Sequence, residues 1–203
     1  MNVLNYIDKK IIWIFGPAAA GKTTFIAFLN NQLKKRNIKP LNLSDLKELI
    51  SVIKKDKEKM FHQNIAKNQF RITKPFVYDL VFLNLLKKIS ENRKKNKPIL
   101  IEVSCGLDLK KKFNLSIKSR LNLIPKDVIK QSKFIYINTP LIRRQQFNQK
   151  RGGFSKTPKE IFNRFFQKDD FNEINQKKFH FLVINNHGKI GLLNKFAQQI
   201  FLK

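Results

Sequence analysis

The residues from Gly16 to Thr23 follow the pattern Gly-x-x-x-x-Gly-Lys-Thr, which suits phosphate binding. Gly16 and Gly21 allow consecutive backbone N–H groups to point into one concave anion site. A helix that starts at Lys22 would add the positive end of its dipole. We expect Lys22 to reach the β- and γ-phosphates of a nucleotide and the Thr23 hydroxyl to hold Mg²⁺. The motif therefore predicts a nucleoside-triphosphate site.

A second group of residues suited to phosphate lies in the stretch LIRRQQFNQKRGGFSK. Arg144, Asn148 and Arg151 are spaced i, i+4 and i+7, which puts them on one face of a helix. Gly152-Gly153 then allows a hinge. Planar arginine donors suit the three charged oxygens of a phosphoryl group in transfer. We favour Arg144 and Arg151 as phosphate clamps; the alternative is one more basic surface helix.

The same N-terminal stretch has a competing interpretation as a secretory signal peptide. Lys9 and Lys10 precede an apolar run, and three alanines follow it. A signal peptide needs an apolar region of roughly 7 to 15 residues. Gly16-Pro17 ends this run after Phe15, so the phosphate-binding interpretation is preferred.

The elements expected to position these residues are short buried strands that alternate with helices. Strands are predicted at 11–15, 39–43, 99–103, 134–138 and 180–184. Helices are predicted at 22–35, after Ser44, at 58–70, 75–90, after Pro140, at 157–168 and at 189–202. This order predicts an α/β fold with a parallel sheet covered on both faces.

Composition limits the remaining possibilities. The 203 residues are enough for one domain with a proper core, and no apolar run approaches the roughly 20 residues of a membrane span. Cys105 is the only cysteine, so a reducing, cytoplasmic setting is expected. The net charge of +28 is extreme, but the lysines are spread along the chain. A bias toward A/T-rich codons explains this spread better than a nucleic-acid partner, which stays possible but is not favoured.

With these elements in order, the chain resembles the P-loop kinase group of nucleoside, nucleotide and related small-molecule kinases. The resemblance rests on GPAAAGKTT, LNLSDL, PILIEVSCG, FIYINTP with the arginine-rich helix after it, and FLVINNHGK. It implies a three-layer αβα sandwich with a five-stranded parallel sheet of order 2-3-1-4-5. It also implies a single domain over 1–203 with a small helical lid at about 141–157.

The resemblance also implies roles for individual residues. Glu102 stands where the group places an acid that binds Mg²⁺ or takes a proton from the acceptor, and Asp45 stands where related kinases contact the acceptor or place a base. The alternatives are an N-cap or ion pair for Glu102 and a dipole-favoured acid in a first helical turn for Asp45. The expected nucleotide-binding set is Gly16, Pro17, Ala18, Ala19, Ala20, Gly21, Lys22, Thr23, Thr24, Asn186 and Gly188. For Thr24 the favoured interpretation is a helix surface residue.

The leading hypothesis is an ATP- and Mg²⁺-dependent kinase that phosphorylates a small metabolite, with a nucleoside or nucleotide as one option. Where deoxynucleoside kinases usually show Glu-Arg-Ser, this chain has Glu102-Val103-Ser104, which argues against a deoxynucleoside. One alternative is a polynucleotide 5′-hydroxyl kinase or another P-loop enzyme that acts on nucleic acid. The other is a nucleotide-binding protein without catalysis. No membrane partner is expected.

Overall fold

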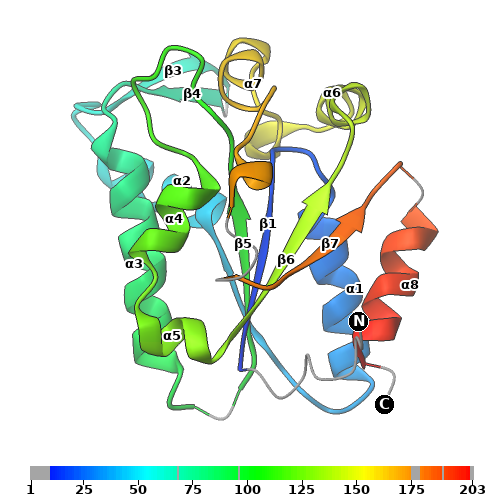
Figure 1. Cartoon of the computed structure of the whole chain (residues 1–203). Helices are drawn as coiled ribbons and strands as arrows, with labels where there is room; N and C mark the ends of the chain where they lie inside the picture. The colour runs from blue at the N-terminus through cyan, green and yellow to red at the C-terminus, as the bar shows by residue number, and fades with distance from the viewer. Residues whose placement is uncertain (1–9, 68, 96, 175–178, 189, 202–203) are drawn as a thin grey trace.

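The structure is a computed structural model that describes residues 10–67, 69–95, 97–174, 179–188 and 190–201. Residues 1–9 and the predicted helix ends at 189 and 202 lie outside the described residues. A five-stranded parallel sheet forms the centre (Figure 1). Its strands are β1 (Ile11–Gly16), β2 (Leu41–Ser44), β5 (Ile99–Ser104), β6 (Ser132–Asn138) and β7 (Phe181–Asn185).

The strand order is β2-β5-β1-β6-β7, which is the predicted order when the strands of this sheet alone are counted. β1 is central and buried along its whole length, because both of its edges are paired and helices cover both faces. The register places Gly16 beside Ser104, so the ends of β1 and β5 lie side by side. The α/β fold predicted from the sequence is confirmed.

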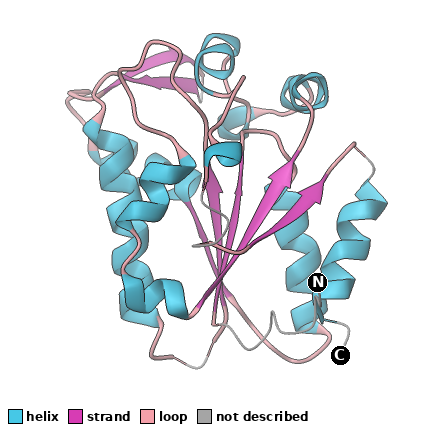
Figure 2. Cartoon of the chain, in the orientation of Figure 1, coloured by secondary structure: helices cyan, strands magenta, loops and turns pink. Residues whose placement is uncertain are grey.

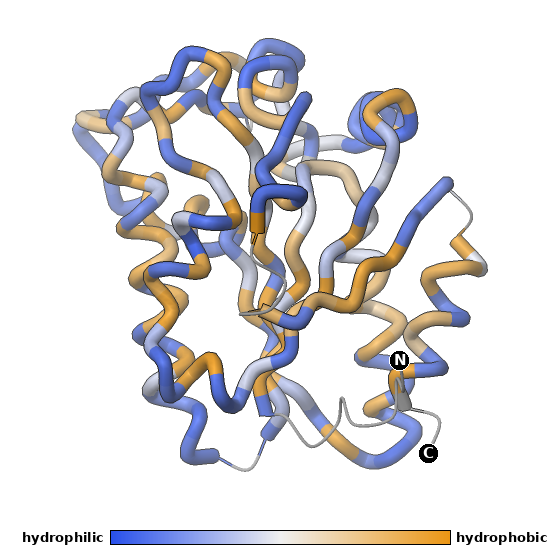
Figure 3. The backbone as a smooth tube through the Cα atoms, in the orientation of Figure 1, coloured by the Kyte–Doolittle hydropathy of each residue, from blue (hydrophilic) through white to orange (hydrophobic). Residues whose placement is uncertain are grey.

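Helices cover the two faces of the sheet, and alternate residues of β1 serve each face. Ile12 and Ile14 pack against α1 (Lys22–Lys34) and α8 (Ile190–Phe201), which carry long hydrophobic stretches (Figure 3). Trp13 and Phe15 face the opposite layer. The helices on that side of the sheet are α2 (Asp45–Lys55), α3 (Phe76–Asn92), α4 (Ile117–Leu123) and α5 (Lys126–Lys130). No helix in the described ranges has the length and hydrophobicity needed to span a membrane.

The helix predicted at 58–70 is wrong. This region forms an antiparallel hairpin of β3 (His62–Ala66) and β4 (Gln69–Ile72), separate from the main sheet (Figure 2). A buried hydrogen bond between His62 and Asp56, with 2.7 Å between Nδ1 and Oδ2, fixes the start of the hairpin. Arg71 reaches Glu160, which is 89 residues away in the chain. Distant contacts of this kind override the weak local helical pattern.

The C-terminal ends of the strands carry the segments that surround the candidate site (Figure 1). These are α6 (Leu141–Gln149), the 3₁₀ turn η2 (Gly153–Ser155) and α7 (Lys159–Phe165). A second 3₁₀ turn, η3 (Phe171–Glu173), precedes β7. α7 starts after Pro158 without a side-chain cap, and the backbone of Thr157 is hydrogen-bonded to the Asn148 side chain. It ends at Phe165 rather than at Lys168.

Candidate active site

The loop between β1 and α1 has the backbone geometry that its two glycines predict. Gly21 has φ = +98°, a conformation that side chains disfavour, and a Cβ there would lie 2.8 Å from Nδ2 of Asn186. A Cβ on Gly16 would lie 2.7 Å from the carbonyl oxygen of Ile137. Ala19 also has positive φ, at 62°. The loop therefore curls tightly over the end of the sheet, and its backbone N–H groups and the start of α1 are suited to bind an anion.

Two side chains from neighbouring strands hold this loop in place. Thr139 Oγ1 and Asn186 Nδ2 both donate to the carbonyl oxygen of Ala20, at 2.8 and 2.9 Å. The backbone N–H of Gly188 donates to Asn186 Oδ1 at 3.1 Å. The Asn186 side chain thus supports the loop, and the nucleotide contact expected for Asn186 stays a prediction. Thr139 was not predicted in this role, because its sequence position indicated only the start of a helix.

Lys22, Thr23 and Glu102 meet at the mouth of the loop. Lys22 is 3% exposed, and its Nζ donates to the carbonyl oxygens of Gly16 and Pro17 at 2.9 and 2.8 Å. Burial lowers the pKa of Lys22 below its ordinary value, and the carboxylates of Glu102 and Asp45 oppose this shift. Thr23 Oγ1 donates to Glu102 Oε1 at 2.9 Å. Thr24, by contrast, lies exposed on α1 as favoured from the sequence.

Asp45 begins α2 and is held by two backbone groups. Its Oδ2 accepts from the N–H of Ser104 at 2.5 Å, and its Oδ1 accepts from the N–H of Leu46 at 2.7 Å. Burial raises the pKa of Asp45 from 3.8 to about 6, although Lys22 and the Ser104 bond act in the opposite direction. A fixed carboxylate with a pKa near neutrality is suited to accept a proton.

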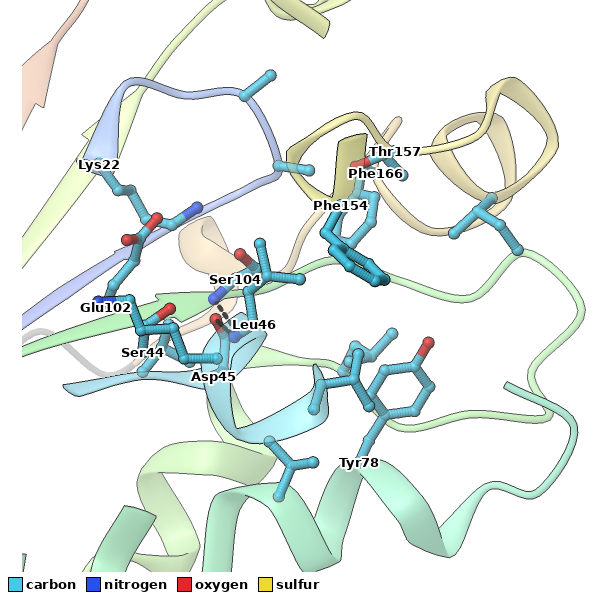
Figure 4. A pocket seen from close by; sticks show the side chains of 18 of the residues that line it. Lys22, Ser44, Asp45, Leu46, Tyr78, Glu102, Ser104, Phe154, Thr157 and Phe166 are labelled. Atoms are coloured by element: carbon cyan, nitrogen blue, oxygen red, sulfur yellow. Dashed lines mark hydrogen bonds between the residues drawn. The ribbon is translucent and has the colours of Figure 1, made fainter. Parts of the chain in front are cut away.

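These groups line one cavity of about 460 Å³ (Figure 4). Lys22 and Glu102 lie on one side in this view, Asp45 and Ser104 lie in the middle, and Tyr78, Phe154 and Phe166 lie on the other side. The volume falls within the usual range for small-molecule sites. The loop and the two acids therefore border the same cavity as a largely apolar chamber.

The structure places the two predicted clamp arginines very differently. Arg151 lines the cavity, and Glu102 acts electrostatically on its guanidinium. Arg144 is 5% exposed and does not line the cavity. Its guanidinium donates to the backbone carbonyl oxygens of Thr139, Phe166 and Gln167. The prediction of Arg144 as a phosphate clamp is corrected: Arg144 ties α6 to the segment after α7.

The different positions follow from where α6 ends. Arg144 and Asn148 lie on one buried face of α6, as their spacing predicts. The helix stops at Gln149, so Arg151 lies in the following loop, where it lines the cavity. Asn148 makes two hydrogen bonds with the backbone of Thr157, at 2.7 and 2.9 Å. Asn148 thereby closes the loop that carries Arg151.

Replacing Arg144 by methionine is expected to lower the free energy of unfolding by about 2–4 kcal/mol, because buried carbonyl groups lose their donors. Urea denaturation measures this change. Arg143→Met, at an exposed position of the same helix, is the matched control and should change the free energy of unfolding little. A normal stability with a loss of phosphate transfer would instead restore Arg144 as a clamp.

Comparisons with known proteins place this fold in a defined class. A scan against protein-family models found no match, and a search of curated proteins also found none. Among solved structures, the chain has the fold of the P-loop small-molecule kinases. A sugar kinase from Janibacter sp. aligns with a TM-score of 0.61 at 12% identity, over 95% of this chain and 94% of that chain.

Two further kinases show the same architecture. A gluconokinase from Sinorhizobium meliloti has a TM-score of 0.52 at 11% identity, over 96% of this chain and 93% of that chain. An APS kinase from Mycobacterium tuberculosis, solved in complex with AMPPNP and APS, has a TM-score of 0.53 at 11% identity, over 96% of both chains. At these identities the similarity establishes the fold, and function has to be argued from the site.

Proposed function

We propose that the protein is an ATP- and Mg²⁺-dependent kinase that transfers the γ-phosphate to a hydroxyl group of a small metabolite. The observation that carries this proposal is the convergence of Lys22, the Thr23–Glu102 pair and Asp45 on one cavity beside the anion-binding loop. A protein that only binds nucleotide has no need of a chamber with a second, partly buried acid beyond the phosphates. The chamber is where an acceptor would bind.

The residues present fit Mg²⁺. Thr23 Oγ1 and the Glu102 carboxylate are oxygen ligands, 2.9 Å apart, at the mouth of the loop. In the part of the chain that the structure describes, no group of three or more His, Cys, Asp or Glu side chains could hold a metal by itself. Mg²⁺ usually keeps several waters and is held by one or two protein groups together with substrate phosphates. When bound, it would offset the negative charge of the β- and γ-phosphates.

Different side chains of the protein would bind the phosphates and activate the acceptor. Lys22 would leave the carbonyl oxygens of Gly16 and Pro17 and bind the phosphate oxygens, while Arg151 would stabilise the transferred group from the opposite loop. Asp45 would orient the acceptor hydroxyl and take its proton, because Ser104 and Leu46 fix the carboxylate in position. The apolar wall would exclude water and so limit wasteful hydrolysis of ATP.

A γ-phosphate transfer screen tests the proposal. Labelled ATP with Mg²⁺ is offered pools of sugars, sugar acids, nucleosides, nucleotides and 5′-hydroxyl oligonucleotides, and ATP binding is measured by calorimetry. Transfer to a small acceptor supports the proposal. Transfer only to oligonucleotide ends would favour the polynucleotide kinase, and binding without transfer to any pool would favour a non-catalytic protein.

The pKa of Asp45 predicts the acid limb of the pH–rate profile. Because its raised pKa is about 6, the carboxylate is ionised above that pH and protonated below it. A base must be ionised to act, so kcat/KM should fall about tenfold for each pH unit below about 6. Steady-state rates from pH 5 to pH 9 measure this limb.

Phosphate esters also take up a proton near pH 6, so a control is needed. Glu102→Gln, whose residual rate still depends on Asp45, should keep an acid limb at a somewhat lower pH, because the charge of Glu102 is one of the causes that raise the pKa of Asp45. In Asp45→Asn, the decrease in kcat/KM that comes from protonation of Asp45 should disappear. The ATP affinity of this variant is measured over the same pH range, which shows the effect of protonation of the nucleotide. A flat profile in the wild-type protein down to pH 5 would remove Asp45 as the base.

A further inference from the structure

The cavity changes character beyond Asp45. The wall on that side is largely apolar and includes aromatic rings from four different parts of the chain. These rings belong to Phe70 on β4, Tyr78 and Phe82 on α3, Phe154 in η2 and Phe166 after α7. Figure 4 shows Tyr78, Phe154 and Phe166 on the side of the cavity away from Lys22 and Glu102. The acceptor body would therefore contact ring faces and edges rather than a network of polar groups.

The charged groups of the wall do not change this picture. Arg120 lines the cavity, but its Nη1 is paired with Asp79 Oδ1 at 3.2 Å, and its Nη2 donates to the carbonyl oxygen of Asn114 at 3.2 Å. Its guanidinium also lies 5.1 Å from the centre of the Phe82 ring. The charge of Arg120 is thus largely balanced within the protein. Lys47 and Lys156 line the cavity as well; Lys47 is exposed, so its charge remains hydrated, and Lys156 is partly exposed.

A polyol is a poor match for this chamber. Every hydroxyl group that a ligand buries needs a hydrogen-bond partner, and an unpartnered hydroxyl costs affinity. A planar ring gains from contact with aromatic side chains and needs polar partners only at its edge. The polar side chains that line the chamber include Asp45, Gln69, Tyr78, Arg120 and Lys156, which come from separate segments and stand among apolar side chains. They suit one hydroxyl and the edge of a ring better than the several adjacent hydroxyls of a polyol.

We propose that the acceptor is an uncharged alcohol carried by a planar aromatic or heteroaromatic ring, and that Phe70 and Phe154 determine this specificity. The inference rests on the proposed kinase function and names its substrate class. The ring would lie among the aromatic side chains, with its hydroxyl directed to Asp45. In the balanced step, a γ-phosphoryl group of ATP forms a bond to the acceptor oxygen, the bond to the ADP oxygen breaks, and Asp45 takes the hydroxyl proton.

Phe70 and Phe154 close the chamber from two separate segments. Their ring centres are 6.2 Å apart, which joins the β3–β4 hairpin to the loop after α6. Nearby, Nη1 of Arg71 in the hairpin lies 3.3 Å from Oε1 of Glu160 in α7. Phe154 is 37% exposed, so shortening its side chain should remove contact with the ligand at little cost to the core. Phe70 also packs against the buried cluster between α2 and α3, so the free energy of unfolding of Phe70→Ala is measured as well.

Two acceptor pools test the substrate class. The ring-bearing pool contains adenosine, thymidine, pyridoxine and benzyl alcohol, and the polyol pool contains glucose, gluconate, shikimate and glycerol. Transfer of labelled phosphate from ATP is expected with the ring-bearing pool, at a kcat/KM at least about tenfold above any polyol. Preferential transfer to a polyol, or no transfer to any ring-bearing alcohol by a protein that binds ATP, overturns the inference.

Variants then test the two aromatic residues. Phe154→Ala and Phe70→Ala should each raise KM for the best ring-bearing acceptor about tenfold or more, while kcat and the dissociation constant of ATP change little. Phe76→Ala is the matched control, because Phe76 is 53% exposed and does not line the cavity. An unchanged KM in both variants contradicts the specificity role. Failure of the wild-type protein to bind ATP would instead contradict the proposed function.

Discussion

The Lys22→Ala protein is expected to lose phosphate transfer by about a thousandfold or more. In the present arrangement the Lys22 ammonium is buried and is held by two carbonyl oxygens of the loop. A cation at this position would stabilise the charge that develops on the transferred phosphoryl group, and loss of one such group from a dry site commonly costs two to three orders of magnitude in rate. Single-turnover rates with saturating ATP measure the loss.

Stability has to be measured together with this rate, because the Lys22 side chain also bonds the loop. Removal of Nζ leaves the carbonyl oxygens of Gly16 and Pro17 without this donor, so a decrease of about 1 kcal/mol in the free energy of unfolding is expected. Lys34→Ala, at an exposed position near the end of the same helix, controls for the loss of one positive charge. Wild-type turnover in Lys22→Ala would remove the basis for a kinase assignment.

The loop and the sheet were predictable because their signals are local. The spacing from Gly16 to Thr23 specifies backbone conformations and a helix start within a few residues. The buried strands are short apolar runs whose neighbours along the chain are helices, which restricts the sheet to a parallel arrangement. The order of the strands came from the resemblance rather than from these patterns. The structure confirms both the fold class and that order.

The chamber was not predictable, because it is built from contacts between distant segments. Phe70, Arg120 and Phe154 carry no common motif and become neighbours of the loop only in the folded chain. The hairpin that supplies Phe70 was mistaken for a helix for the same reason. Arg144 and Arg151 show the limit of periodicity, since helical spacing predicts a shared face but not that α6 stops at Gln149.

The Glu102→Gln protein is expected to keep its shape and much of its ATP affinity while its turnover falls by about a hundredfold or more. Gln retains an oxygen that can accept the hydrogen bond of Thr23 Oγ1, so the geometry at the mouth of the loop should persist. It lacks the negative charge that would bind Mg²⁺ and orient the reacting groups. Loss of a charge-orienting or acid–base group commonly reduces the rate by two to four orders of magnitude.

Paired measurements separate the role of Glu102 from that of Asp45. The dissociation constant of ATP is measured with and without Mg²⁺, and the single-turnover rate is measured with the best acceptor. If Glu102 supports the metal, the gain in ATP affinity that Mg²⁺ gives the wild-type protein should shrink in Glu102→Gln. An acid limb that belongs to Asp45 should remain, at a somewhat lower pH, because the charge of Glu102 no longer raises the pKa of Asp45. Glu91→Gln, an exposed change on α3, is the matched control. Unchanged turnover in Glu102→Gln would leave Asp45 as the one acid of this pair with a catalytic role, because Asp45 is the other carboxylate that lines the cavity.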